Sequence, residues 1–327
     1  MSDQMTIKFW GVRGSYPTPF AENMGYGGNT SCVEVTAGAQ TIILDAGSGI
    51  IQLGRELVQR YRASPINATL LLSHLHHDHT QGFPFFAPIH FPSTRLSIFG
   101  PEIGERTPEA ALVEVMHPSS FPVGFHDLSS KRVVRTLHDK DQLRLASENV
   151  TLYRGADKSV NTNEVVIRTM RSDTHPGGVM FYRIEWQGCS VVYATDTERA
   201  LTNNQQLIKF ARGADLLIHD AQYTSEHYLG FKVGFPCTKG WGHSTPAMAC
   251  DVARAAGVKQ LAFFHYDPSY DDEAIAKMER KARKRFHHTI APTEGMSIML
   301  PAIGKACPDA GRVSPSPHHA PLFSAMA

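Results

Sequence analysis

The densest group of chemically reactive side chains is the stretch 74–79, which reads His-Leu-His-His-Asp-His. It offers three imidazoles and one carboxylate, with one histidine to spare, and it directly follows the apolar run 68–72. Imidazole is a borderline ligand and carboxylate a hard one, so the mixture suits zinc, manganese or ferrous iron. Four ligands so close together cannot all bind one ion in good tetrahedral geometry. The spacing therefore favours two adjacent ions, against the plainer alternative of a histidine-rich surface turn.

Six apolar runs of the chain end at, or lead to, a polar residue that can bind a metal ion or hold a ligand. In chain order these residues are Asp45, His74, His175, Asp196, Asp220 (with His219 before it) and His265. In sheets with helical crossovers, ligand sites gather at the carboxyl ends of the strands. One such residue would mean little, but six of them predict a shared site at one edge of the sheets.

The elements that must position these residues begin as strands in hairpin-like groups and then alternate with helices. This order predicts an α/β fold of mixed sheets flanked by helices, an αββα sandwich. The predicted strands cover residues 6–10, 31–35, 41–44, 68–72, 96–99, 150–153, 165–170, 179–186, 190–194, 216–218 and 260–264. The predicted helices cover residues 51–61, 109–116, 203–211, 246–256 and 272–286.

Composition places limits on the class of protein. Hydrophobic residues make up 42% of the 327 residues, enough for a large core, and the formal net charge of +1 gives no basic field that would attract nucleic acid. The first ten residues lack the apolar core of a signal peptide, and no apolar run approaches the roughly 20 residues of a membrane span. Five scattered cysteines without a Cys-x-x-Cys spacing fit reduced thiols. These features predict a cytoplasmic protein with one domain over 1–304 and a disordered tail over 305–327.

The motifs resemble those of the metallo-β-lactamase superfamily of dinuclear metallohydrolases, over roughly residues 5–301. The stretch 74–79 carries this resemblance together with Asp45, the His-Pro-Gly-Gly segment at 175–178, Asp196 in Ala-Thr-Asp-Thr-Glu, and His265. Three further segments are similar to the phosphodiesterase branch related to ribonuclease Z. They are Phe-Trp-Gly-Val-Arg-Gly-Ser at 9–15, Gly-Gly-Asn-Thr-Ser at 27–31 and Gly-His-Ser-Thr at 242–245.

The resemblance implies a site for two divalent metal ions, with zinc expected first and manganese or iron as alternatives. It assigns His74, His76 and His175 to the first ion, Asp78, His79 and His265 to the second, and Asp196 to both as a bridge. It also implies that Asp45 orients a ligand histidine by a hydrogen bond, that Asp220 plays a similar supporting part, and that His77 points away from the metals.

The resemblance further implies a reaction in which a metal-bridging hydroxide attacks the phosphorus of a phosphodiester. Asp78 would ligate the second ion and orient the nucleophile, and His243 would protonate the leaving alkoxide. Ser244 or Thr245 ahead of Pro246 also fits the start of a helix, so His243 as a mere neighbour of a helix cap is the alternative.

The leading prediction is a phosphodiesterase for small nucleotides, with 3′,5′-cyclic nucleotides as the best single guess, because the compact length and neutral charge favour a small substrate. One alternative is an RNA endonuclease like ribonuclease Z, although the Gly/Pro-rich arm with which such enzymes grip tRNA is not found in the sequence. Another is a hydrolase of carboxylic esters, lactones or β-lactams on the same scaffold. A metal-binding sensor is a third. The resemblance also suggests a homodimer.

Three segments could influence the choice of substrate. The aromatic-rich stretch 82–137 could stack on a base, but core packing is the favoured interpretation for any single ring. The basic run 277–285 could contact RNA phosphates, but neighbouring acidic residues favour a solvated helix face. The stretch 139–163 is interpreted as a lid, a dimer contact or a surface hairpin.

Overall fold

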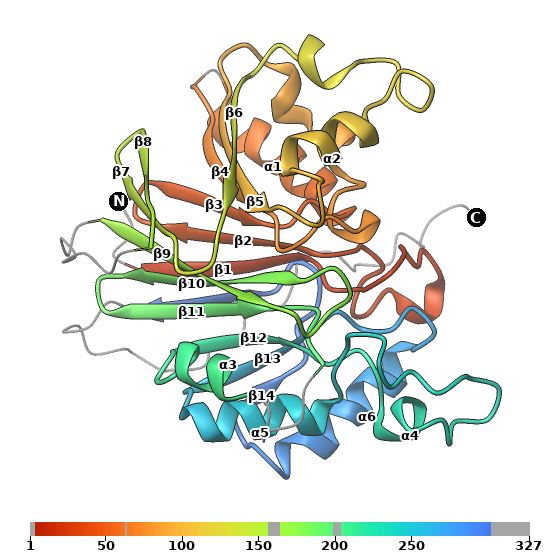
Figure 1. Ribbon diagram of the computed structural model, residues 1–327. Helices are drawn as coiled ribbons and strands as arrows, with labels where there is room; N and C mark the ends of the chain where they lie inside the picture. The colour runs from red at the N-terminus through yellow and green to blue at the C-terminus, as the bar shows by residue number, and fades with distance from the viewer. Residues whose placement is uncertain (1–3, 63, 156–163, 199–203, 302–327) are drawn as a thin grey trace, which may run out of the picture.

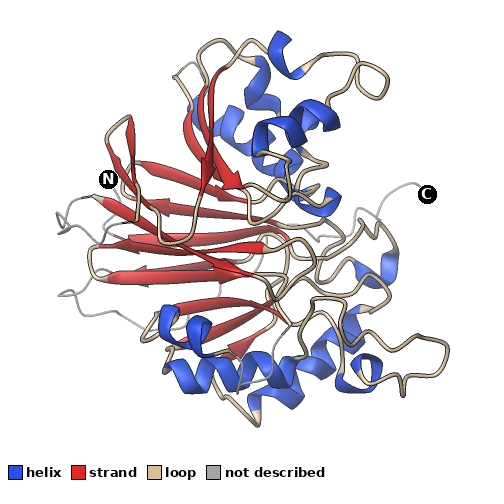
Figure 2. Ribbon diagram, in the orientation of Figure 1, coloured by secondary structure: helices blue, strands red, loops and turns tan. Residues whose placement is uncertain are grey.

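The computed structural model describes residues 4–62, 64–155, 164–198 and 204–301. Two mixed β-sheets lie face to face, and helices cover the outer face of each, as Figures 1 and 2 show. This arrangement confirms the predicted αββα sandwich. The predicted tail at 305–327 lies outside the described residues.

The first sheet has seven strands in the order β15-β1-β2-β3-β4-β5-β6. Strands β3 to β6 run parallel to one another, whereas β15, β1, β2 and β3 pair in antiparallel fashion. The bounds are β1 Gln4–Gly11, β2 Cys32–Ala37, β3 Gln40–Leu44, β4 Asn67–Leu71, β5 Arg95–Pro101, β6 Lys131–Leu137 and β15 Ser297–Pro301.

The second sheet has eight strands in the order β14-β13-β12-β11-β10-β9-β7-β8. Strands β11 to β14 are parallel, and the other neighbours are antiparallel. The bounds are β7 Gln142–Ala146, β8 Asn149–Tyr153, β9 Val165–Ser172, β10 Val179–Trp186, β11 Cys189–Ala194, β12 Leu216–Asp220, β13 Gln260–Phe264 and β14 Thr289–Ile290.

Two helices lie on the first sheet, α1 (Gly49–Tyr61) and α2 (Pro108–Val115), and three on the second, α3 (Gln205–Phe210), α5 (Pro246–Ala256) and α6 (Asp272–Arg283) (Figure 1). Helix α4 (Ser225–Tyr228) is a single turn, and short 3₁₀ turns cover Ala21–Asn23, His77–His79, Phe83–Phe85, Ala87–His90 and Phe125–Asp127. Among the described residues, no helix combines the length and the apolar character needed to cross a membrane.

The main hydrophobic core lies between the two sheets. Phe9 of the first sheet contacts Phe264 of the second, with ring centroids 6.4 Å apart, and Tyr193 lies against the same ring at 5.5 Å. A second core lies under α1, where Leu53 and Leu57 pack on the outer face of the first sheet. The two cores fix the sheets relative to each other, and the site described below depends on this because its residues come from both sheets.

Every predicted strand and helix has a counterpart, but β6, β7, β14 and β15 were not predicted. Three of these four strands lie at the edge of a sheet, where the strand has a neighbour on one side and none on the other. Strand β6 shows the consequence, because its residues alternate between exposed and half-buried and include two arginines and a lysine. An edge strand of this kind carries little of the apolar signal on which prediction depends.

The segments expected to influence substrate choice behave mostly as structural elements. Phe83, Phe86 and Phe125 are buried in the second core, as core packing predicts. The described part of 139–163 is a β7–β8 hairpin. The basic side chains at the end of α6 pair with acids: Lys281 with Glu226, Arg283 with Glu279 and Arg285 with Asp251. The four cysteines among the described residues are free thiols.

Candidate metal centre

The predicted site residues converge at one edge of the sandwich. Asp45 follows β3, His74 follows β4, Asp196 follows β11 and His265 follows β13. Strands β3 and β4 are parallel neighbours in the first sheet, and β11 and β13 are parallel in the second, with β12 between them. The carboxyl ends of parallel strands meet at the same edge of a sheet. Asp45, Asp196 and His265 all have a positive φ, at 63°, 50° and 66°. Non-glycine residues rarely adopt this conformation, and their clustering here is typical of functional sites.

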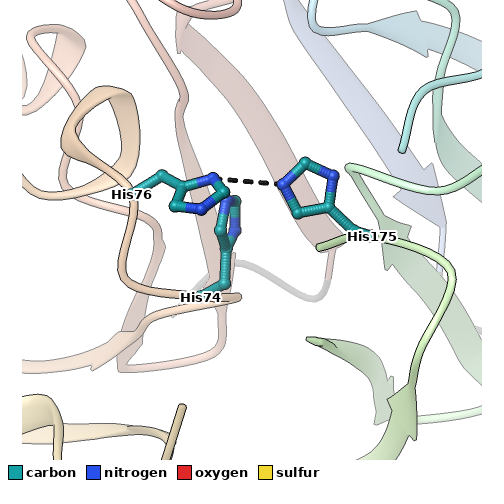
Figure 3. A group of neighbouring side chains, drawn as sticks. All are labelled: His74, His76 and His175. Atoms are coloured by element: carbon teal, nitrogen blue, oxygen red, sulfur yellow. Dashed lines mark hydrogen bonds between the residues drawn. The ribbon is translucent and has the colours of Figure 1, made fainter. Parts of the chain in front are cut away.

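The first candidate group consists of His74, His76 and His175, whose ring nitrogens lie within 4.8 Å of one another. Figure 3 shows the three rings facing a common point, with His76 Nδ1 and His175 Nε2 3.1 Å apart. His74 Nε2 is buried and has no hydrogen-bond partner. A buried nitrogen without a partner is costly unless a ligand or a water molecule satisfies it.

The second candidate group consists of Asp78, His79 and His265. Asp78 Oδ2 lies 3.0 Å from His265 Nε2 and 3.3 Å from His79 Nε2, and the two imidazole nitrogens are 3.2 Å apart. All three residues are buried. His77, between these ligands in sequence, is exposed and belongs to neither group.

Asp196 lies between the two groups with one oxygen toward each. Its Oδ2 is 3.6 Å from His74 Nε2 and 3.7 Å from His175 Nε2. Its Oδ1 is 3.4 Å from both His79 Nε2 and His265 Nε2. This is the placement required of a carboxylate that bridges two cations.

Hydrogen bonds at Nδ1 hold four of the histidines so that Nε2 faces the centre. His79 donates to Asp45 Oδ2 at 2.7 Å, His265 to Gln222 Oε1 at 2.9 Å and His175 to the Gly242 carbonyl at 3.1 Å. His74 Nδ1 lies 3.1 Å from Ser73 Oγ. Partners of this kind fix both the tautomer and the ring angle of a metal ligand.

The protonation states expected from the surroundings suit metal binding at five of the candidate ligands. Burial holds the pKa of His74 well below its ordinary value and also lowers the pKa of His76 and His175, so these rings are neutral. Burial alone would raise the pKa of Asp78 and Asp196, but the neighbouring histidines outweigh it and hold both pKa values well below the ordinary range. Neutral imidazoles and ionised carboxylates are the ligand forms that divalent metals need.

His79 differs from these five ligands. Burial lowers its pKa, but the carboxylates of Asp78, Asp196 and Asp45 outweigh burial and hold that pKa well above its ordinary value. A metal ion at the second group would therefore displace a proton from His79.

The donor set fits two divalent cations. Asp78 and Asp196 are buried carboxylates whose ion-pair partners within the described residues are all histidines, with no lysine or arginine among them. Buried negative charge without a permanent cation beside it is unfavourable. Metal ions would supply the missing positive charge, and this donor set does not discriminate among zinc, manganese and iron.

His243 stands beside both groups, held by Asp220. Its Nδ1 donates to Asp220 Oδ2 at 2.7 Å and lies 4.0 Å from Asp196 Oδ2, and its ring stacks on His265 with centroids 5.0 Å apart. Burial lowers the pKa of His243, but the carboxylate of Asp220, with Asp196 and Asp78, outweighs burial and raises that pKa to about 9. A protonated imidazole at this place can donate a proton.

The structure also shows the contacts of several residues whose roles the sequence did not define. Asp220 was expected only as a general support, and it holds His243 rather than a ligand of either group. His219 is buried beside it but belongs to neither group. Tyr193, Gln222 and Glu198 were not singled out. Glu198 had a signal, since it ends the Ala-Thr-Asp-Thr-Glu motif, whereas Tyr193 and Gln222 look like ordinary strand and loop residues.

Known proteins resemble this chain in both sequence and fold. The family model described as the beta-lactamase superfamily domain matches residues 40–266. Ribonuclease Z of Thermoplasma acidophilum is 25% identical over 312 residues, which cover 88% of this chain and 94% of that protein. Ribonuclease Z of Archaeoglobus fulgidus is 25% identical over 328 residues, covering 89% and 96%.

Solved structures support the same fold. The metallo-β-lactamase fold protein YhfI of Bacillus subtilis aligns with a TM-score of 0.62 and 17% identity, over 91% of this chain and 100% of that one. The short form of human tRNase Z aligns with a TM-score of 0.56 and 19% identity, over 90% and 98%. These structures confirm the predicted fold, and the family match with the ribonuclease Z relatives confirms the prediction of a metal-dependent hydrolase. With its family match, its ribonuclease Z relatives and this fold, the chain belongs to the metallo-β-lactamase superfamily, in the branch related to ribonuclease Z.

Proposed function

We propose that this protein is a phosphodiesterase dependent on two divalent metal ions and that its substrate is an RNA phosphodiester. The observation that carries the proposal is the placement of His243, which Asp220 holds beside Asp196 and between the two candidate metal groups. A general acid is most useful when the leaving group is a poor one, such as a ribose alkoxide.

The chain's own residues have distinct parts in this proposal. His74, His76 and His175 would hold one ion, and Asp78, His79 and His265 the other, with Asp196 shared. Two such ions, when bound, would lower the pKa of a water molecule and neutralise charge on the phosphate. The N–H of Ser15 donates to Asp78 Oδ2 at 2.8 Å and fixes that carboxylate within the second group. His243 gives a proton to the oxygen that leaves as the P–O bond breaks.

RNA is proposed as the substrate ahead of cyclic nucleotides because the relatives named above are ribonucleases. The compact length and neutral charge of the chain favour a small substrate such as a 3′,5′-cyclic nucleotide. The relatives named above are ribonucleases Z, and they align with this chain over nearly their full length. Cyclic nucleotides therefore become a comparison substrate, and carboxylic esters serve as the test of a different reaction class.

The test is hydrolysis of four substrates by protein loaded separately with zinc, manganese or iron. The substrates are a single-stranded oligoribonucleotide, cyclic AMP, an activated aryl phosphodiester and an aryl carboxylic ester. We expect cleavage of the oligoribonucleotide, abolished by Asp78→Ala. We expect His243→Ala to slow RNA cleavage by roughly 10²- to 10⁴-fold and to slow the aryl diester far less, because that leaving group needs no proton.

Each other outcome contradicts part of the proposal. Equal loss on both diesters in His243→Ala would exclude the acid role. Turnover of cyclic AMP without RNA cleavage would restore the prediction made from the sequence. Turnover of the carboxylic ester alone would move the protein to a different class of hydrolase.

A further inference from the structure

Two exposed aromatic side chains belong to loops whose backbone contacts the candidate ligands, one loop at each candidate group. Trp241 is 50% exposed and Tyr16 is 56% exposed, so neither ring is part of the core. Trp241 belongs to the loop between α4 and α5, which projects from the body of the sandwich beside α4 (Figure 1). Tyr16 belongs to the loop after β1.

Trp241 adjoins the first group through its neighbour Gly242. The Gly242 carbonyl accepts a hydrogen bond from His175 Nδ1, and a Cβ at Gly242 would lie only 2.3 Å from that atom. Residue 242 must therefore be glycine, and its φ of 93° requires the same. Trp241 is therefore the immediate sequence neighbour of the residue that contacts the His175 ring.

The backbone that carries Trp241 is fixed on both sides. Glu198 accepts hydrogen bonds from the N–H of Gly240 at 2.6 Å and from the N–H of Gly242 at 2.7 Å. Its Oε1 also accepts from the Tyr228 hydroxyl at 2.7 Å, which ties the loop to α4. One carboxylate thus holds the backbone on both sides of Trp241, whose ring remains half exposed.

Tyr16 adjoins the second group in a similar way. The N–H of Ser15 donates to Asp78 Oδ2 at 2.8 Å, and the N–H of Tyr16 donates to the Gly14 carbonyl at 2.7 Å. Gly14 lies so close to His265 that a Cβ there would be 2.4 Å from the imidazole. Tyr16 is therefore also held at a fixed position beside the ligands.

A cleft of about 930 Å³ opens beside His175, the one member of the first group that lines it. Gly240 and Gly242, the residues on either side of Trp241, belong to its lining, whereas Trp241 itself does not. Its size is that of a site for a small ligand. Its charged lining residues are Asp139, Asp173 and Glu198 against Arg171. Because this lining has no net positive charge, the cleft itself does not attract phosphates, and contacts other than phosphate pairing would have to hold a strand there.

We propose that Trp241 and Tyr16 are stacking platforms for the two nucleosides on either side of the scissile phosphate, Trp241 on the side of the first group and Tyr16 on the side of the second. The inference rests on the proposed RNA phosphodiesterase function and names its substrate as an unpaired strand. Stacking of a base on an aromatic side chain contributes about 1–3 kcal/mol and tolerates any base. Rings on fixed backbones lose little entropy when a base binds.

Binding is tested first, without reliance on turnover. Trp10 and Trp186 are buried, so an exposed quencher reaches mainly Trp241 among the three tryptophans. A 2′-O-methyl oligonucleotide titrated into the zinc-loaded protein should quench this fluorescence. An abasic strand of equal length and charge should not. Equal binding of both strands would overturn the proposal.

Kinetics supply the second test. Trp241→Ala and Tyr16→Ala should each raise KM for the oligoribonucleotide by roughly 5- to 150-fold, the equivalent of one lost stack. Both should leave kcat for the aryl phosphodiester unchanged, and Trp241→Phe and Tyr16→Phe should restore most of the loss. The control is Phe91→Ala, an exposed ring near the amino end of β5, at the opposite end of the sheet from the centre. It should change nothing.

The outcomes separate this proposal from the proposed function. An unchanged KM in both alanine variants, with RNA cleavage intact, would overturn the platforms alone. Base-dependent quenching without hydrolysis of any diester would overturn the function and leave the platforms standing. A change in molecular mass on Trp241→Ala, measured by light scattering, would instead assign the ring to contact with a second copy of the chain.

Discussion

The carboxylate of Asp45 accepts four hydrogen bonds. They come from the N–H and the hydroxyl of Ser73 at 2.6 and 2.8 Å, from His79 Nδ1 at 2.7 Å and from the Tyr193 hydroxyl at 2.7 Å. Burial, with the negative charge of Asp45 beside it, holds the pKa of Tyr193 well above its ordinary value, so its hydroxyl remains a donor. At the scale of single residues, Tyr193 acts on the second metal group through Asp45 and His79.

We therefore expect Tyr193→Phe to weaken zinc binding by roughly 10- to 100-fold, because loss of an outer hydrogen bond loosens a ligand. Competition with a chromophoric chelator measures this. Tyr182→Phe is the matched control, since Tyr182 is equally buried and donates one hydrogen bond, to the Leu72 carbonyl at 2.6 Å. Both variants should lose about 0.5–1.5 kcal/mol of stability. Equal zinc affinity in the two variants would contradict the role of Tyr193.

At the scale of elements, the start of helix α5 fixes the segment that carries His243, the proposed general acid. Thr245 caps this helix, and its hydroxyl accepts from the Met248 N–H at 3.3 Å. His243 lies only two residues before the cap, and Ser244 between them donates to the Thr197 carbonyl. The helix-cap interpretation and the acid interpretation of this segment are thus compatible, because different residues serve each.

Thr245→Ala should lower stability by about 0.5–2 kcal/mol through loss of the cap. It should also lower the rate of RNA cleavage, since the helix start fixes His243. Thr107→Ala is the control, because Thr107 caps α2 in the same manner, with Pro108 after it and a bond from Ala110 N–H at 3.2 Å. Thermal unfolding and kcat are measured for both. If kcat falls equally in the two variants, the cap has no special link to the acid.

At the scale of the whole molecule, the candidate ligands join the two sheets. The ligands in 74–79 follow β4 of the first sheet, whereas His175, Asp196 and His265 follow strands of the second. Ions bound by both sets would hold the sheets together at this edge. A ligand that binds only the folded state stabilises it by mass action.

Zinc should therefore raise the midpoint of thermal unfolding, by an amount equivalent to about 2.7 kcal/mol at a free concentration 100 times Kd, and a chelator should reverse the rise. His265→Ala should lose much of this shift. His77→Ala should keep it, since His77 lies in the motif but outside both groups. A zinc shift that is the same in both variants would show that the metal binds elsewhere.

Much of this protein follows from its sequence by local rules. Helix α5 was predicted with its observed bounds, because Thr245 and Pro246 mark its start and Gly257, with a φ of 63°, marks its end. The polar residues after β3, β4, β11 and β13 are visible as breaks in apolar runs. Residue type and order along one strand are local properties, so these predictions needed no knowledge of tertiary contacts.

Only the tertiary structure decided how the parts meet. That Asp196 presents one oxygen to each group depends on three other segments of the chain, around His74, His175 and His265. That Asp220 holds His243 and that Glu198 brackets Trp241 depend on residues 23 to 44 positions apart in sequence. Tyr193 reaches Asp45 across 148 residues, from one sheet to the other. Such contacts follow from how the two sheets pack, because a hydrogen bond depends on positions within fractions of an ångström. The sequence by itself determined which groups the site contains, and packing determined which of them touch.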